Sequence, residues 1–293
     1  MFRLFLNSLQ MEYIITPKSP ILIKSGIHSP NPSLPDMQFV RTLTANGETI
    51  FIPGSSLKGV FRSFTEKVLR TIDKKLACDP FGNDACGKKL INVENATEVY
   101  KNSCYACKLY GNTRMRGRIA FTDAYPKGDV KTEIRYGVAI SRLSNAVAHG
   151  PFEMEICVAG KFKGTIIIEN FSIWQLGLLS LTIKSINDGL VRIGYGKNRG
   201  LGEINFEIEQ VTIDFAKRNI PETEIWGIGK LLPEEDRKRY GIHEDDLLRD
   251  IPESTSETNL AIFTRRMYDS KRWKKITEKS IVYLTQYFSS EEG

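Results

Sequence analysis

Two segments with helical periodicity, each flanked by β-rich runs, constrain the fold of this chain more than any other feature of its sequence. After a Pro-Gly-Ser turn at residues 53–55, apolar residues recur at helical spacing at Leu57, Val60, Phe61, Phe64, Val68 and Ile72. Residues 172–187 end in an Asp-Gly pair and place on one side Trp174, Leu178, Leu181 and Ile186. Both segments are expected to be amphipathic helices.

Alternating or β-branched runs predict strands over residues 10–16, 49–52, 115–122, 152–169 and 201–215. Strand, helix, strands, helix and final strand give the order β-α-β-β-α-β, which is typical of ferredoxin-like and RRM-like folds. The chain is therefore predicted to be an α+β protein. Residues 1–216 are expected to form this RRM-like domain with long insertions, and residues 217–293 a charged, Pro-punctuated helical C-terminal extension with a helical stretch at 260–288.

The positive excess of the chain lies in residues 1–216. Lys and Arg outnumber Asp and Glu by 27 to 20 in that part, whereas the numbers are 14 and 15 from residue 217 onward. Such an excess fits a polyanionic partner held through counterion release, or it is simply a solvated surface. No run of 18 apolar residues occurs and the N-terminal segment does not resemble a signal sequence. We therefore expect a cytoplasmic protein that does not associate with membranes.

Four glycines and two cations lie between the second helix and the last strand, at Gly194, Gly196, Lys197, Arg199, Gly200 and Gly202. Glycine permits positive φ and a close approach of the backbone, so bare N–H groups and the two cations could receive a phosphate. The alternative is an ordinary helix-to-strand turn with solvated cations. A Rossmann dinucleotide-binding loop is excluded, because no helix follows the glycines.

The start of the first helix is a second candidate anion site. Gly54, Ser55 and Ser56 open the helix, and Lys58 and Arg62 share one of its faces. The N–H groups of the first turn, the positive end of the helix dipole and the two cations favour an anion. The spacing does not match a Walker A loop, and an ordinary capped core helix is the alternative interpretation.

Together, residues 52–62, the sequence Ile-Ser-Arg-Leu at 140–143 and the loop at 194–202 resemble the RAMP superfamily, specifically the crRNA-binding backbone subunits of type III (Csm- or Cmr-like) CRISPR effector complexes. The resemblance covers roughly residues 10–215. It implies an RRM-like palm, copies of which multimerise along a guide RNA, and a thumb hairpin at residues 135–163 that separates bases at regular intervals. Base pairing would then provide sequence recognition, so the protein needs contacts only to shape and phosphate.

The resemblance also implies residues that bind RNA and one that cleaves it. The RNA-binding residues would be His28, Gly54, Ser55, Ser56, Lys58, Arg62, Arg142, Gly194, Gly196, Lys197, Arg199, Gly200 and Gly202. The cleaving residue would be Asp36, the only acid in the loop of residues 24–41. Its carboxylate would hold Mg²⁺ or position the attacking 2′-hydroxyl, although a turn or cap aspartate is the structural alternative. This loop has prolines after His28 where the family has glycines.

Four cysteines gather in a predicted insertion at about residues 76–112: Cys78, Cys86, Cys104 and Cys107. The last two have the C-x-x-C spacing of tetrahedral zinc sites, whereas the first two are farther apart than in a zinc ribbon. Zinc, disulfides and unlinked thiols all remain compatible with this pattern. Resemblance to RAMP subunits with a structural zinc in this insertion favours Zn²⁺.

The sequence leaves three functions open. The leading hypothesis is a backbone subunit that binds crRNA independently of its sequence, multimerises along it beside other effector subunits, and acts as a Mg²⁺-dependent endoribonuclease on complementary target RNA. The second is the same scaffold without cleavage. The third is a stand-alone RAMP endoribonuclease that processes precursor RNA, which would require His28 or His149 near a scissile phosphate.

Overall fold

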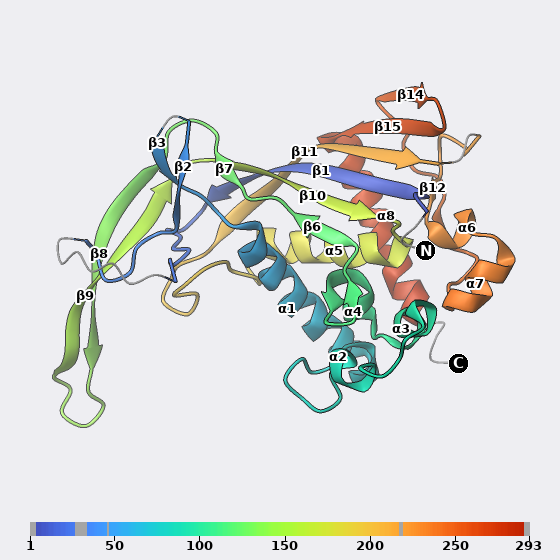
Figure 1. Cartoon of the computed structure of the whole chain (residues 1–293). Coiled ribbons are helices and arrows are strands. Elements are labelled where there is room, and N and C mark those ends of the chain that lie inside the picture. Colours follow the sequence, from blue (N-terminus) through green and yellow to red (C-terminus); the bar gives the residue numbers. More distant parts are fainter. Residues whose placement is uncertain (1–3, 27–33, 46, 217–218, 290–293) are drawn as a thin grey trace.

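The computed structural model describes residues 4–26, 34–45, 47–216 and 219–289. At its centre is an antiparallel sheet with the strand order β11–β1–β10–β6. These strands are β1 (Asn7–Pro17), β6 (Ile119–Phe121), β10 (Phe162–Glu169) and β11 (Ile204–Phe215). Two helices, α1 (Gly54–Ile72) and α5 (Ile173–Asn187), lie on one face of this sheet (Figure 1). This mixed α+β arrangement agrees with the ferredoxin-like order expected from the sequence.

Both helices begin at recognisable caps. α1 follows Pro53, and the N–H of Gly54 donates to the carboxylate of Asp123 at 2.8 Å. At the start of α5, the N–H of Ser172 donates to the side chain of Gln175 at 3.1 Å, one half of a capping box. After α5 the chain turns at a glycine with a φ of +78°, the left-handed conformation that ends many helices. The two helices predicted from periodicity are therefore confirmed, but α5 is not amphipathic: it is buried on almost all sides, because it also packs against the C-terminal helix at residues 270–289.

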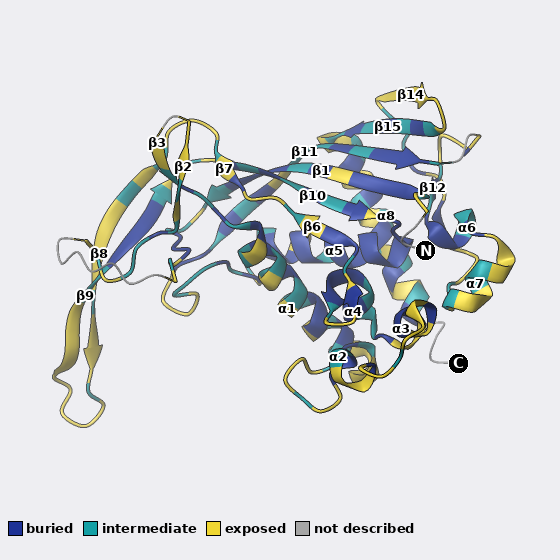
Figure 2. Cartoon of the chain, viewed as in Figure 1, coloured by how far each residue is buried: buried dark blue, intermediate teal, exposed yellow. Residues whose placement is uncertain are grey.

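The predicted strand at 152–169 is divided in two, because Gly160 interrupts it with a φ of +145°. Its first part belongs to β9 (Val147–Ala159), which pairs with β8 (Lys131–Ile140) in a separate hairpin, and its second part is β10. The hairpin extends away from the sheet, and its outer part is exposed (Figure 2). A projecting hairpin thus occupies most of residues 135–163, the segment expected to be a thumb.

Short elements fill the segment between α1 and β6, where the Cys-rich insertion was expected. They are a 3-10 helix (Lys74–Leu76), α2 (Cys86–Lys89), α3 (Ala96–Asn102), α4 (Tyr105–Tyr110), β4 (Gly111–Asn112) and β5 (Met115–Arg116). The predicted strand at 49–52 lies outside the main sheet, in a hairpin of β2 (Arg41–Thr44) and β3 (Gly47–Ile50). After β6, β7 (Tyr125–Pro126) pairs with β10. The insertion packs against α1 and adds no strand to the main sheet.

The prediction of a helical extension over residues 217–293 needs correction. The described part of this segment contains β12 (Ile225–Trp226), α6 (Ile228–Leu231), α7 (Glu234–Tyr240), β13 (Leu247–Leu248), β14 (Ser256–Leu260), β15 (Phe263–Asp269) and α8 (Ser270–Ser289). β15 pairs with β11, and β14 pairs with β15, so both extend the central sheet. Among the described residues, no helix combines the length and the apolar character that crossing a bilayer requires.

Strand β15 was missed because its inward-facing positions are largely polar. Every second residue is buried, namely Thr264, Arg266 and Tyr268. The guanidinium of Arg266 pairs with Glu257 at 2.6 Å and donates to the backbone carbonyl oxygens of Ile220, Pro221 and Glu224. An arginine whose N–H groups are hydrogen-bonded in this way can be buried in a protein core. A search for alternating apolar residues cannot find such a strand.

The contact between α5 and α8 leads to a stability prediction. A Cβ on Gly177 of α5 would lie 2.5 Å from the carbonyl oxygen of Ser280 in α8, whereas one on Gly59 of α1 would meet no atom within 4 Å. Gly177→Ala should therefore destabilise the protein by about 1–3 kcal/mol through overpacking. The matched Gly59→Ala should stabilise it by up to about 1 kcal/mol through helix propensity. Denaturant unfolding of the two variants measures both effects, and equal stability would contradict the close helix crossing.

Candidate nucleic-acid interface

The start of α1 lies against β6. Gly54 is buried there, and a Cβ on it would come within 2.2 Å of the carbonyl oxygen of Phe121. Close packing against β6 is therefore enough to explain why residue 54 is a glycine. Its N–H already donates to Asp123. Ser55 is exposed and Ser56 is half-buried, so their side chains are the accessible polar groups at this helix start.

Lys58 and Arg62 share the face of α1 that points to the insertion, but their surroundings differ. Arg62 donates to the carboxylate of Glu66 at 2.8 Å and to the carbonyl oxygen of Gly111 at 3.1 Å. Lys58 has its pKa lowered by burial and by the positive charges of Arg62 and Arg116. Arg116 is exposed and was missing from the sequence-based candidates. With Arg62 engaged inside the protein, Lys58 and Arg116 are the cations best placed for an anion on this side.

The glycine-rich loop before β11 is shaped by the protein's own backbone. A Cβ on Gly194 would lie 2.3 Å from the carbonyl oxygen of Leu22, and one on Gly202 would lie 2.3 Å from that of Ile193. Both glycines have positive φ, so the turn itself requires them. Gly200 also has positive φ, but it is exposed, and a Cβ on it would meet no atom within 4 Å. Close packing therefore explains Gly194 and Gly202, as expected for an ordinary turn. The tip of the loop at Gly200 stays accessible.

A cavity of about 320 Å³ separates this loop from α1 and is lined by three cations, Lys67, Arg192 and Lys197. No Asp or Glu of the described chain lines it. Burial and the charge of Lys67 lower the pKa of Lys197, and Arg192 donates to the carbonyl oxygen of Lys197 at 3.0 Å. Lys67 follows Lys58 by nine residues, which at roughly 100° per residue places it on the opposite side of the helix. Helical spacing could thus have identified Lys67 as a cation on the other side of α1. That Arg192 lines the same cavity as Lys67 follows only from the fold.

The β8–β9 hairpin carries the remaining predicted contacts. Arg142 is exposed in the turn that joins the two strands, at the outer end of the hairpin (Figure 1). His149 is exposed on β9, and His28 lies outside the described residues. The predicted RNA-binding residues therefore form three separate groups, at α1, at the glycine-rich loop and at the hairpin tip.

Asp36 lies beside the middle of this hairpin, at the position where Glu153 pairs with Tyr136. Its Oδ2 accepts the N–H of Glu153 in β9 at 2.9 Å, and the neighbouring Met37 forms a bridge with Met154. The side chain of Asp36 is exposed. No group of three or more His, Cys, Asp or Glu residues in the described chain includes it. Asp36 thus has a structural contact, and it could offer a carboxylate to solvent or to a ligand.

The four cysteines of the insertion are brought together. The Sγ atoms of Cys78, Cys86, Cys104 and Cys107 all lie within 4.8 Å of one another, and those of Cys78 and Cys107 are 3.7 Å apart. Tetrahedral zinc with Zn–S bonds of about 2.3 Å separates its sulfur ligands by roughly 3.8 Å. Hydrogen bonds among the thiols lower the pKa of Cys104 and raise those of Cys86 and Cys107, so in the absence of a metal the cluster favours one thiolate, at Cys104. The cluster is compatible with zinc, and none of its cysteines forms a disulfide.

This cluster is tied to α1 by two arginines. Arg62 approaches the Sγ of Cys107 at 3.9 Å, and Arg70 donates to the carbonyl oxygen of Cys78 at 2.7 Å. Both arginines also pair with Glu66, which is buried between them. The cysteines and the cationic face of α1 therefore form one connected unit.

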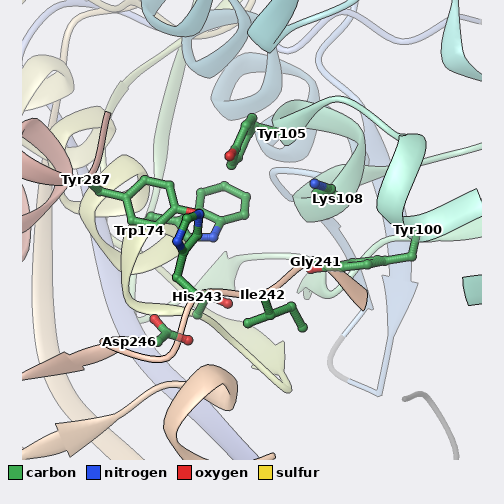
Figure 3. A pocket seen from close by; sticks show the side chains of 10 residues that line it. Tyr100, Tyr105, Lys108, Trp174, Gly241, Ile242, His243, Asp246 and Tyr287 are labelled. Carbon is green, nitrogen blue, oxygen red and sulfur yellow. The ribbon is translucent and has the colours of Figure 1, made fainter. Parts of the chain in front are cut away.

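A second side-chain cluster lies between the insertion, α5 and the C-terminal region (Figure 3). Its cavity measures only about 10 Å³, room for a single water, and its aromatic walls include Tyr105, Trp174 and Tyr287. The carboxylate of Asp246 accepts the N–H groups of Ile173 at 2.7 Å and Gly229 at 2.9 Å, and burial raises the pKa of Asp246 to about 6. These contacts hold the start of α5, so we regard this cluster as structural.

Comparison with known proteins identifies the family. The family model of the RAMP superfamily matches residues 14–205, while no curated protein gives a significant match. The matched span begins in β1 and ends in β11, so it contains α1, the cysteine cluster, the hairpin and the glycine-rich loop. Because this match covers well over half of the chain and coincides with its ferredoxin-like core, the protein belongs to the RAMP superfamily, a group of CRISPR-associated RNA-binding proteins.

Proposed function

We propose that this protein is a backbone subunit of a type III CRISPR effector complex and binds crRNA through its phosphates. The observation that carries the proposal is the charge on the two sides of α1. The cavity toward the insertion is lined by Lys58, Arg62 and Arg116, and the cavity toward the glycine-rich loop by Lys67, Arg192 and Lys197. Neither is lined by a carboxylate of the described residues. Concave cationic surfaces of this kind attract a polyanion.

The shape of the chain supports repeated binding along a guide. The exposed β8–β9 hairpin projects from the sheet, so it can reach a neighbouring stretch of RNA or a second copy of the chain. In the proposed complex, copies multimerise along crRNA beside other effector subunits, and base pairing with the guide selects the target RNA. The protein itself then needs no contact that reads a base.

Binding of RNA should depend strongly on salt and weakly on sequence. Lys58→Ala combined with Lys197→Ala removes one cation from each side of α1 and should weaken every RNA sequence alike. For single strands, the slope of log K against log salt should fall by about 0.7 for each phosphate that the protein no longer neutralises. Fluorescence anisotropy with several unrelated RNAs measures both quantities.

The matched control for this experiment is Lys274→Ala, an exposed lysine on α8. It should leave affinity and slope unchanged. A double variant that changed sequence preference while keeping the parental slope would refute the phosphate contacts.

We further propose that Asp36 serves the cleavage of complementary target RNA. An exposed carboxylate outside any cluster of acids suits Mg²⁺, which is commonly held by one or two carboxylates together with substrate phosphates. Mg²⁺, when bound, would neutralise charge that develops on the scissile phosphate. Asp36 would hold that ion or orient the 2′-hydroxyl, while the N–H of Glu153 fixes the direction of its carboxylate.

A non-cleaving scaffold is the second candidate, and one observation favours it. The hydrogen bond from Glu153 gives Asp36 a structural role, holding the loop of residues 34–39 against the middle of the hairpin, and this role requires no chemistry. The cysteine cluster is proposed to bind one structural Zn²⁺ in either case, because four thiol ligands close a tetrahedral site.

A further inference from the structure

A cavity of about 810 Å³ lies between α1 and the insertion. This size is within the range of small-molecule sites, which are concave and mostly apolar with a few polar groups. Three of the clustered cysteines, Cys78, Cys86 and Cys107, also line this cavity. The proposed phosphate contacts use its cations and leave its apolar lining without a partner.

The cations of this cavity come from both of its walls, from α1 and from the insertion. Lys58 and Arg116 line this cavity and also a neighbouring one of about 250 Å³ that includes Gly54 and Ser55. The two cations thus stand where the helix start meets the larger cavity. Lys88 lies in the wall formed by the insertion, where its Nζ donates to the carbonyl oxygen of Phe81 at 3.4 Å.

The insertion contributes apolar surface. Pro80, Ile91 and Met115 line the cavity, and Ile91 keeps 61% of its surface exposed although it is a large apolar residue. Asn112, a polar residue of the wall, uses its amide inside the protein: it donates to the hydroxyl of Ser103 at 3.1 Å and accepts the N–H of Arg114 at 2.8 Å. The wall therefore offers apolar contact area to a planar group such as a base. The Asn112 amide is already hydrogen-bonded within the protein.

We propose that this cavity receives one nucleotide of the bound RNA, with its base against Ile91 and Met115 and its phosphate between Lys58 and Arg116. The proposal rests on the RNA-binding function proposed above and adds a pocket for a single unstacked base. Single-stranded RNA can present such a base, because its nucleotides splay out of a stack more easily than those of a duplex. Since the Asn112 amide has internal partners, it is not available to select one base over another.

The test uses the full chain, purified without chelator, and a short oligouridylate that carries 4-thiouridine. Ultraviolet cross-linking followed by peptide mass spectrometry should attach the RNA to the peptides that contain Ile91 or Met115. Ile91→Ser should lower the affinity roughly threefold to tenfold, because it removes apolar surface beside the base. It should leave the salt slope unchanged, because every phosphate keeps its cation. The exposed position of Ile91 keeps the fold intact.

The matched control is Ile262→Ser, since Ile262 is equally exposed, at 67%, in the turn between β14 and β15. It should change neither affinity nor cross-linking. The pocket would be overturned if RNA bound with the expected salt slope but cross-linked only elsewhere, and if Ile91→Ser left the affinity unchanged. The proposed function would still stand in that case. Absence of any salt-dependent RNA binding by the parent protein would overturn both.

Discussion

Replacing Asp36 by alanine should abolish cleavage of complementary target RNA by the assembled complex, with a loss of at least about 100-fold. A carboxylate that holds a divalent ion or a reacting hydroxyl stabilises the transition state by several kcal/mol, and each 1.36 kcal/mol corresponds to about tenfold in rate. Affinity for guide and target should hardly change, because a negative side chain contributes nothing favourable to phosphate binding. Cleavage of labelled target with and without Mg²⁺, beside a binding measurement, tests both statements.

Asp36→Asn separates the chemical role of this residue from its structural one. Asparagine keeps an oxygen that can accept the N–H of Glu153, but it removes the charge. If the carboxylate acts in cleavage, Asp36→Asn should be as inactive as Asp36→Ala. If Asp36 only accepts the N–H of Glu153 in the hairpin, Asp36→Asn should retain activity. Asp129→Asn, a change at another exposed acid, should cleave normally. Undiminished cutting by Asp36→Ala would assign the chemistry to another residue, and an inactive parent complex would support the scaffold.

Cys104→Ser should release zinc and loosen the insertion. Purified parent protein is expected to contain about one zinc ion per chain, because a closed structural site uses four protein ligands. Apparent binding energies of structural zinc are on the order of 10 kcal/mol and contribute to folding, so a site with three cysteines should lose most of its metal and part of its stability. Elemental analysis and thermal unfolding, before and after treatment with a chelator, provide the measurements.

Loss of zinc should also weaken RNA binding on the insertion side of α1. Arg62 and Arg70 connect the cysteines to that helix, so disorder around Cys78 and Cys107 would reach the wall that faces Lys58. Cys157→Ser is the matched control, because Cys157 is buried in the core away from the cluster and donates to the carbonyl oxygen of Ala159. That variant should keep its zinc. Metal-free parent protein, or full retention of zinc by Cys104→Ser, would exclude the site.

Periodicity located the elements whose buried face is apolar. α1 and α5 repeat their apolar residues at helical spacing, and β1 and β11 lie where strands were predicted. By contrast, the predicted helix at 260–288 includes strand β15, whose buried Arg266 is satisfied by carbonyl oxygens far away in the sequence. Periodicity predicts a buried strand only where its buried side chains are apolar. A strand such as β15, whose buried positions are largely polar, therefore cannot be predicted from the sequence pattern.

The sequence by itself determined the candidate chemistry: residue type and spacing identified the four cysteines as candidate ligands and the cations as candidate phosphate contacts, and the family resemblance favoured zinc over disulfides. Tertiary structure decided which of these groups meet. It brought Cys78 to within 3.7 Å of Cys107, engaged Arg62 with Glu66 and Gly111, and placed Lys67 beside Arg192. The reason is that distances between residues far apart in the chain depend on packing, which short-range patterns do not record. Similarly, Gly54 and Gly194 are required by close backbone contacts that exist only in the folded protein.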